Sequence, residues 1–386
     1  MEENKRDTII KLIKNDIDRD TFEGKYNASI RKKVLLIIAL ICISAITLFL
    51  GIGLGSVDIP PIDTFRVLFH PIFPNFVAEP SMSYYSDFIY KGRLPRVILV
   101  ALTGFSLGIA GMVMQGLLRN PLVSPFTLGL STAASFGAAL SIVLGSAIFG
   151  GLVDYSAHIG FINFYASDLI TVLFAFIMAV ISISIVLLMS RGKNTSRSMV
   201  ILSGVVISYL FQAGIMAAKY FSDDDQLREI TMWIMGSFTG STWGEVVILI
   251  PIVIICSIYL MRTALDINAL SAGDDVATNL GVDVNKLRRN GLIVCTLITA
   301  SCLSFTGVIG FIGLMAPHIC RMIIGNDARY LLPSAGLMGI AILSISDLFC
   351  RLIIKPGELP VSIVLYVVGG IFFIWMIGNK KWRQKL

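Results

Sequence analysis

Side chains able to carry chemistry are few and far apart in this chain of 386 residues. Its three histidines, His70, His158 and His318, are too widely separated for a zinc motif of the HExxH type. The sequence has no GxxxxGK[ST] phosphate loop and no GxSxG nucleophile motif. We therefore expect no catalytic residue, no metal site, no cofactor and no ATP hydrolysis by this chain alone.

The cysteines also point away from metal or redox chemistry. None of the six has CxxC spacing, and all lie within or at the ends of apolar stretches. This pattern argues against a disulfide framework and against a zinc site. It predicts small core residues at Cys42, Cys256, Cys295, Cys302, Cys320 and Cys350.

A polar stretch between two apolar runs, LSAGDDVATNLGV at 270–282, is the clearest candidate for a functional contact. Gly273 is followed by Asp274 and Asp275, and acidic residues are favoured in the first turn of a helix. Gly281 suits the position just after a helix end. The pattern predicts a short helix from Asp274 to Leu280.

One face of this predicted helix is apolar, because Val276 and Leu280 are four residues apart. Its polar face is acidic, whereas a helix that lies on a membrane surface normally has a basic polar face. We therefore favour docking on a cytoplasmic protein over membrane contact for this helix.

The composition assigns the chain to the polytopic membrane proteins. Hydrophobic residues make up 55% and charged residues 15%, with a mean hydropathy of +0.81. Windows of about 18 or more nearly uncharged residues recur, each long enough to cross a bilayer as a helix. The predicted fold is all-α, with ten spans at 34–54, 94–117, 126–149, 168–189, 199–218, 245–262, 291–309, 311–324, 332–352 and 361–377.

Charge distribution orients these spans. Ten spans put both ends on one side. If that side is cytoplasmic, the inner segments hold 23 Lys and Arg against 12 acidic residues, and the outer segments hold 8 against 13. This asymmetry favours cytoplasmic ends by the positive-inside rule. The basic excess thus reports topology, so we expect membrane lipid and no nucleic acid as a partner.

The span at 311–324 is the least regular, because it is short and contains Pro317 and His318. It is expected to be a half-helix or a broken helix that lines a cavity. No ionisable residue is expected near a bilayer centre, which counts against a proton- or sodium-coupled carrier. What remains is a conduit that takes its energy from another chain.

Several motifs together resemble the permease subunit of the iron-siderophore, haem and cobalamin class of bacterial type II ABC importers. The resemblance covers about residues 34–380 and keeps the motif order. The motifs are RLPR at 93–96, GLLRNPLVSPFTLGLSTAASFGA at 116–138, WIMGS at 233–237, the 270–282 stretch, FTGVIGFIGLMAPHICRMIIG at 305–325, ISDLFCR at 345–351 and ELPVSIVLYVVGGIFFI at 358–374.

The resemblance implies a ten-helix permease of the cobalamin-importer type, in the cell membrane. It implies a second permease subunit, identical or different, two cytoplasmic ATP-binding subunits and an extracytoplasmic binding protein. The expected division is an N-terminal cytoplasmic extension at 1–33, the permease domain at 34–380 with a coupling loop at 263–290, and a cytoplasmic tail at 381–386.

The resemblance also assigns roles to three residue sets. Arg93, Arg96 and Arg351 match positions that meet acidic residues of the binding protein, and arginine binds carboxylates bidentately; interfacial anchoring is the alternative. Asn120, Pro121 and Leu122 match an inner gate. The element that couples to the ATPase comprises Leu270, Gly273, Asp274, Asp275, Val276, Ala277, Leu280 and Gly281.

The substrate is less constrained than the class of protein. A ferric siderophore is the first expectation, with haem or cobalamin as alternatives. A secondary carrier or channel is the alternative from a different class.

Overall fold

The computed structural model describes residues 19–55, 57, 59–152, 155–159, 162–189, 197–355 and 357–379. Residues 1–18 of the predicted cytoplasmic extension and the predicted tail at 381–386 lie outside these residues. The first described helix, α2, begins at Arg19, so residues 19–33 continue without a break into the first predicted span.

Ten helices correspond to the ten predicted spans, which confirms the all-α polytopic fold. Eight are long and apolar enough to cross a membrane, while α6 and α14 are shorter apolar helices within the described residues. Their bounds are α2 Arg19–Gly53, α5 Leu94–Leu118, α6 Leu130–Phe149, α7 Ala166–Met189, α8 Arg197–Phe221, α10 Trp243–Arg262, α13 Val284–Thr306, α14 Ile312–Ile324, α15 Ala328–Ile353 and α16 Val361–Gly378.

Short elements connect these helices. Two strands, β1 Ser156–Ile159 and β2 Ile162–Tyr165, pair antiparallel as a hairpin between α6 and α7. The remaining elements are helical: α3 Pro61–Phe69, α4 Tyr84–Asp87, the π-helix η1 Phe88–Arg93, the 3-10 turn η2 Gly150–Leu152, α9 Asp224–Met235, α11 Ala264–Ser271 and α12 Asp274–Asn279.

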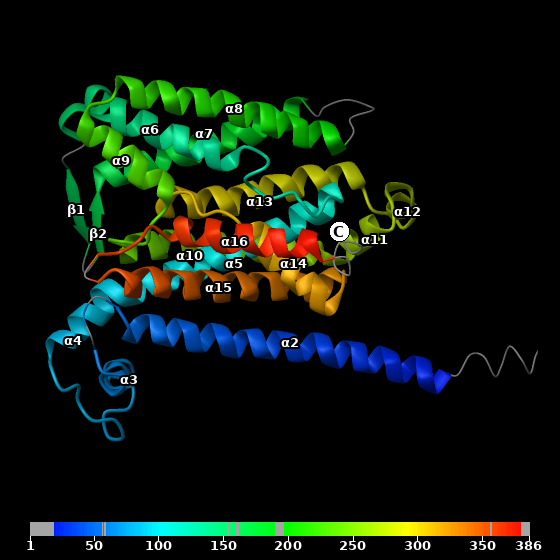
Figure 1. Cartoon of the computed structure of the whole chain (residues 1–386), viewed down its shortest axis with the longest axis horizontal. Coiled ribbons are helices and arrows are strands. Elements are labelled where there is room, and N and C mark those ends of the chain that lie inside the picture. The colour runs from blue at the N-terminus through cyan, green and yellow to red at the C-terminus, as the bar shows by residue number, and fades with distance from the viewer. Residues whose placement is uncertain are drawn as a thin grey trace, which may run out of the picture.

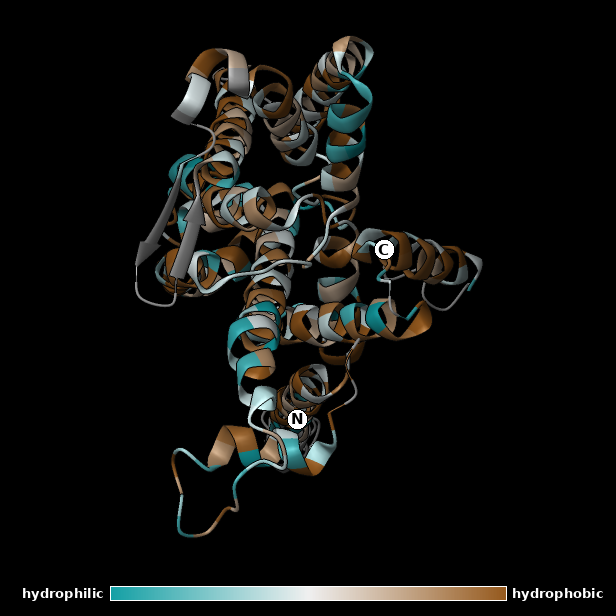
Figure 2. Cartoon of the chain, turned by 90° about the vertical axis from the view of Figure 1, so that its left-hand side faces the viewer, coloured by the Kyte–Doolittle hydropathy of each residue, from teal (hydrophilic) through white to brown (hydrophobic). Residues whose placement is uncertain are grey.

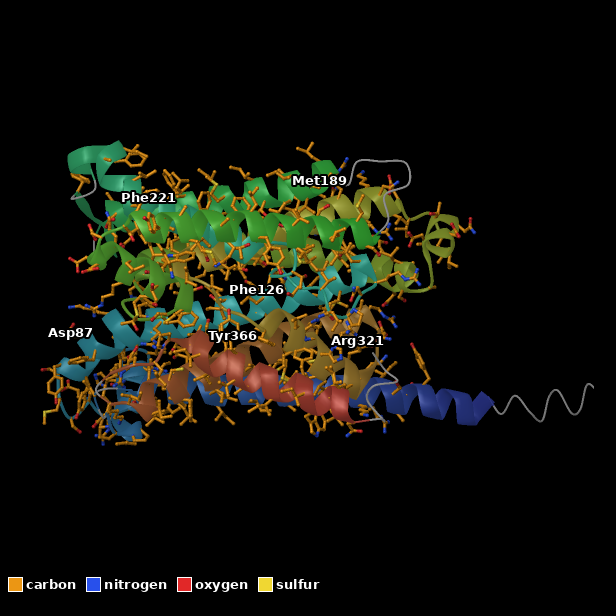
Figure 3. The ribbon with its side chains drawn as sticks, turned by 45° about the horizontal axis from the view of Figure 1, so that its top comes forward. Asp87, Phe126, Met189, Phe221, Arg321 and Tyr366 are labelled. Atoms are coloured by element: carbon orange, nitrogen blue, oxygen red, sulfur yellow. The ribbon has the colours of Figure 1, made fainter. Side chains whose placement is uncertain are left out.

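The connections gather at two ends of the helix bundle (Figure 1). One end carries α3, α4, α9 and the hairpin, and the opposite end carries α11 and α12. The start of α2 and the end of α16 lie at the same end as α11 and α12. Asp87 and Arg321 mark the two ends in the view with side chains (Figure 3). We call the end with α3 and α9 the outer end and the end with α11 and α12 the inner end, following the charge distribution.

Helix α5 runs through the centre of the subunit and packs against α15, α13, α14 and α10. Nineteen of its 25 residues are buried. Three glycines allow its backbone to touch its neighbours: Gly104 faces Gly339, Gly108 faces Ala335 and Gly111 faces Gly313. Close backbone approach of this kind is the usual means of helix association in membranes, where no hydrophobic effect drives helices together.

Helix α14 has only 13 residues, which agrees with the expected half-helix. Irregular, largely buried backbone at 307–311 precedes it, with Gly307 at φ 68° and Phe311 at φ 63°. His318 and the partly buried Arg321 lie inside this helix.

Hydrophobic residues recur along the helices of the bundle, as the ribbon coloured by hydropathy shows (Figure 2). Large hydrophobic residues with at least half of their surface exposed are found along the peripheral helices. Lipid or a second subunit must cover these surfaces, because hydrophobic patches of this size are unfavourable in water. Examples on α8 and α16 are Tyr209, Leu210, Met216, Val367, Ile371, Ile374 and Ile377.

The close crossing of α5 and α14 makes one stability prediction. In Gly111→Ala, the added methyl group would overlap the backbone oxygen of Gly313, so the two helices must separate. We expect a loss of about 1 to 3 kcal/mol, the usual cost of overpacking. Thermal unfolding of the purified protein in detergent measures this loss. The matched control is Gly370→Ala in α16, where an added methyl group meets nothing within 4 Å; equal melting temperatures of both variants would contradict the prediction.

Candidate functional site

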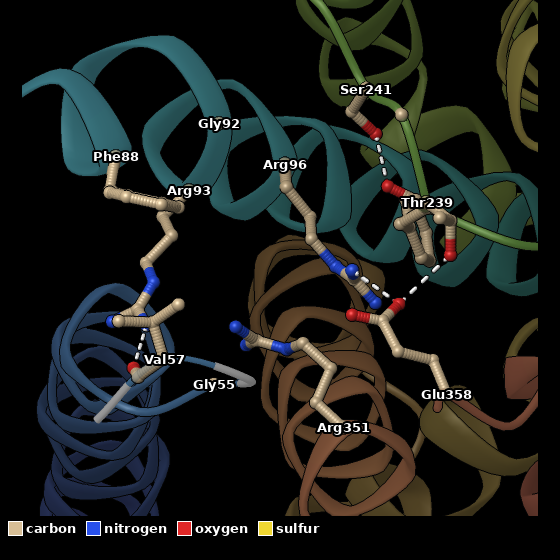
Figure 4. Close-up of a pocket in the computed structure, with 12 residues that line it drawn as sticks. Gly55, Val57, Phe88, Gly92, Arg93, Arg96, Thr239, Ser241, Arg351 and Glu358 are labelled. Atoms are coloured by element: carbon tan, nitrogen blue, oxygen red, sulfur yellow. Dashed lines mark hydrogen bonds and ion pairs between the residues drawn. The ribbon is translucent and has the colours of Figure 1, made fainter. Parts of the chain in front are cut away.

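A cavity of about 220 Å³ opens at the outer end between η1, α5, α15 and the loop after α9. All three arginines of the predicted docking set line it, and Figure 4 shows the side chain of Arg96 reaching Glu358. The other lining residues are Gly55, Val57, Phe88, Gly92, Phe238, Thr239, Gly240 and Ser241.

Arg96 lies in the first turn of α5 and holds two carboxylates. Its Nε and Nη2 atoms donate to Asp347 Oδ1 at 3.1 and 2.7 Å, and its Nη1 donates to Glu358 Oε2 at 2.7 Å. Asp347 also forms an ion pair with Arg351, which lies one turn later on α15: Asp347 Oδ2 is 3.0 Å from Arg351 Nη2. The Asp347 side chain is 2% exposed. These four residues, which we call the outer charge cluster, tie α5 to α15 and to the loop before α16.

The other two arginines cap the end of α2. Arg351 Nη1 donates to the carbonyl oxygens of Gly51 and Leu54, each at 2.9 Å. Arg93 donates to Ile52 at 2.9 Å and to Gly53 and Val57. The last carbonyl groups of a helix have no intrahelical donors, and a cation also suits the negative end of the helix dipole.

Glu358 lies at the mouth of the cavity, where Thr239 Oγ1 also donates to it at 2.8 Å. Burial acts to raise the pKa of the Glu358 carboxyl, but the charge and hydrogen bonds of Arg96 outweigh burial and hold it below its ordinary value of 4.5. The stabilisation from this pairing is therefore complete above about pH 4.5 and is lost as the pH falls through the lowered pKa.

The docking role of the arginines stays a prediction. Arg93, Arg96 and Arg351 are all buried and have partners within the chain. Snorkelling into the interface does not describe them, because their guanidinium groups point inward to carboxylates and carbonyl groups. A carboxylate from a binding protein would have to displace one of these partners, and Glu358 is the most accessible of them.

The predicted coupling element forms two short helices at the inner end. Leu270 in α11 and Ala277 in α12 are buried against the bundle. Val276 and Leu280 are 44% and 68% exposed, so the predicted apolar face is presented outward. Gly273, with φ 136°, and Gly281, with φ 87°, bound α12 in conformations that favour glycine.

The predicted gate residues form a turn directly after α5. The helix ends at Leu118, and Arg119 takes the left-handed conformation with φ 47°. Asn120 Oδ1 then accepts a hydrogen bond from the Leu122 amide at 2.9 Å. Leu122 is exposed, so this turn leaves a large apolar side chain free to cover an opening.

A second cavity, of about 200 Å³, lies beside this turn. Gln115 of α5 links its walls, accepting from Arg321 Nη2 at 2.8 Å and donating to the Gly313 carbonyl at 3.3 Å. Its lining comprises Met112, Gln115, Gly116, Arg119, Asn120, Pro121, Ile267, Ser271, Arg321, Asn326 and Leu331.

Sequence reasoning missed the partners that complete both sites. Asp347 is an acid inside an otherwise apolar run, four residues before Arg351, and that spacing could have identified it as a buried pair. Glu358 carried no comparable signal, since its partner Arg96 is far away in the sequence. The same holds for Arg288, whose side chain donates to the Leu117 carbonyl at the end of α5.

The outer charge cluster generates a stability prediction. Asp347→Asn leaves Arg96 and Arg351 facing each other without their shared carboxylate, and breaking a buried pair costs about 3 to 5 kcal/mol. We expect a correspondingly lower melting temperature in detergent. The matched control is Asp87→Asn, which removes an exposed pair with Lys91, whose side chains are 69% and 73% exposed. Similar melting temperatures of the two variants would overturn this assignment.

Comparisons with known proteins agree with the geometry. The FecCD transport family matches residues 40–379. The hemin transport system permease protein of Yersinia pestis is 34% identical over 289 residues, or 75% of this chain and 82% of that protein. The Fe(3+)-citrate import system permease protein of Bacillus subtilis is 31% identical over 358 residues, or 92% of this chain and 98% of that protein.

A solved structure has the same fold. It is an inward-facing transporter assigned to the metal-chelate type of ABC transporters, with a TM-score of 0.70 and 27% sequence identity. The match covers 87% of this chain and 96% of the other. The described residues form ten apolar helices, and the family match at 40–379 spans nearly all of them. This chain therefore belongs to the FecCD transport family and is a multi-pass membrane permease.

Proposed function

We propose that this chain is the transmembrane subunit of an ATP-driven importer for ferric siderophores. Membership of the FecCD transport family supports import of a metal chelate. The observation that supports the ATP-driven part is α12, a short acidic helix at the end of the bundle where α2 begins and α16 ends. Val276 within it and Leu280 directly after it are exposed. Such a face is stable only when a partner covers it.

The proposed complex contains this chain, a second permease subunit and two cytoplasmic ATPase subunits. A binding protein outside the membrane delivers the chelate to the outer cavity, with the carboxylates of that protein competing for the arginines around Glu358. The turn at 120–122 closes the path at the inner end. The chain hydrolyses no ATP itself.

Haem and cobalamin remain the alternative cargoes, since relatives that are 34% and 33% identical to this chain are named for hemin transport and for cobalamin import. A secondary carrier or a channel is the alternative mechanism. These mechanisms are separable, because a carrier or channel moves its substrate without an ATPase and a binding protein.

Uptake into proteoliposomes tests the proposed function. The permease is reconstituted with its cognate ATPase and binding protein, and uptake of a radiolabelled ferric siderophore is measured with haem and cobalamin as competitors. We expect uptake only when all components and ATP are present. Equal uptake without ATP would favour the carrier or channel, and competition by haem or cobalamin alone would reassign the cargo.

The proposed orientation has its own test. Impermeant reagents should fail to reach tags at Glu3 and Lys385 in intact cells, because both ends are cytoplasmic. An impermeant thiol reagent should label Asp224→Cys, which lies at the exposed start of α9. Cys42 is replaced by serine as background, since the other native cysteines are buried. Labelling of either terminus from outside would contradict the ten-span topology.

A further inference from the structure

Asp274, the first residue of α12, is paired with arginines of the same chain, so its carboxylate is not a free charge for docking. Asp274 Oδ2 accepts a hydrogen bond from Arg288 Nη2 at 2.8 Å, and Asp274 Oδ1 lies 3.8 Å from Arg119 Nη1. Arg288 belongs to the first turns of α13, and Arg119 directly follows α5. One carboxylate therefore joins α12 to α13 and to the end of α5.

Arg288 makes a second contact beside the turn at 120–122, which we call the gate turn. Its Nε donates to the carbonyl oxygen of Leu117 at 3.1 Å. In a continuing helix this oxygen would accept from the amide four residues later, but that residue is Pro121, which has no N–H. The Asn120 amide bonds to Gln115 instead. Arg288 thus supplies the donor that the proline of the gate turn removes.

Packing makes this contact stiff. A methyl group added at Gly116 would lie 2.6 Å from Ile267 Cγ2 of α11, and one added at Gly291 would lie 2.5 Å from Leu117 Cδ1. The last turn of α5 is therefore in direct contact with both α11 and α13. A displacement of α12 that moves Arg288 must also move the carbonyl group that begins the gate turn.

We propose that Arg288 is a positioning residue that transmits motion from α12 to the turn at 120–122. The proposal rests on the proposed function, because it takes α12 as the contact for the ATPase. Arg288 itself is mostly buried behind α12 and acts through Asp274 and Leu117. Its two diverging N–H groups are essential, since lysine has a single nitrogen and cannot hold both oxygens in this geometry.

The test uses the complete complex in proteoliposomes and measures uptake per ATP hydrolysed. Arg288→Gln and Arg288→Lys should still bind the ATPase and support hydrolysis, with uptake per ATP lowered about tenfold, within the range that substitutions in coupling networks produce. The matched control is Arg289→Gln, because the neighbouring Arg289 is exposed and its side chain bonds only to Asn290 among the described residues. It should retain the wild-type ratio.

A second measurement follows the turn directly. Leu122→Cys, with Cys42 replaced by serine, should change its rate of thiol labelling when ATP is added to the assembled complex. In the Arg288→Gln background this ATP-dependent change should be lost. Asp274→Asn should lower uptake per ATP as well. The double variant Asp274→Asn/Arg288→Gln should lower uptake per ATP little below the value of Arg288→Gln, because both substitutions remove the contact between Arg288 and Asp274.

The outcomes separate the relay from the proposed function. Leu280→Asp should abolish ATPase binding, and Asn285→Asp, which adds the same charge at an exposed position of α13, should not. If Leu280→Asp still binds the ATPase and transports normally, the coupling surface is wrong. If Leu280→Asp behaves as expected but Arg288→Gln keeps the wild-type ratio and labelling change, only the relay is wrong. Loss of ATPase binding in Arg288→Gln would also overturn the relay.

Discussion

The structure depends on the close contact of α5 with its neighbours. Water does not drive helices together inside a bilayer, so association relies on van der Waals contact and on polar links. Gly104, Gly108 and Gly111 remove side chains from one side of α5, and its backbone then rests directly on α14 and α15. This crossing places Arg96 beside Asp347 at the outer end and the gate turn beside α11 at the inner end.

Arginine has the same structural task at both ends. At the outer end Arg93 and Arg351 donate to the last carbonyl groups of α2, and at the inner end Arg288 donates to the last turn of α5. In each case the helix ends in a protein environment where unpaired carbonyl groups are costly. A guanidinium group has five N–H donors, so it can cap a helix and bind a carboxylate at the same time.

The helices were largely predictable because their signal is local. Runs of apolar residues located all ten. The first and last residues of α5, α7, α10 and α16 differ from the predicted bounds by a few residues at most. Helix α13 begins seven residues before the predicted span, since its first turns are polar and lie outside the apolar run. Hydropathy detects the part of a helix that crosses lipid and not its polar extension.

Only part of the candidate site could be predicted, because its remaining contacts join residues that are far apart in the sequence. Gly273, Gly281 and the exposed pair Val276 and Leu280 followed from spacing alone. Asp274 was expected to favour the helix start, but its link to Arg288 depends on where α13 folds back. The resemblance alone suggested a docking role for Arg93, Arg96 and Arg351, whereas their burial follows from the packing of α2, α5 and α15.

Helix α5 joins the wall of the outer cavity to the turn at 120–122. Arg96 lies in the first turn of α5 and Leu117 in its last, about 32 Å apart at 1.5 Å per residue. Between them the glycine contacts with α14 and α15 leave no space for α5 to bend independently. These contacts join α5 to α15, which holds Asp347 and Arg351. Because Arg96 and Arg351 share the Asp347 carboxylate, the contact between α5 and α15 extends to the wall of the outer cavity.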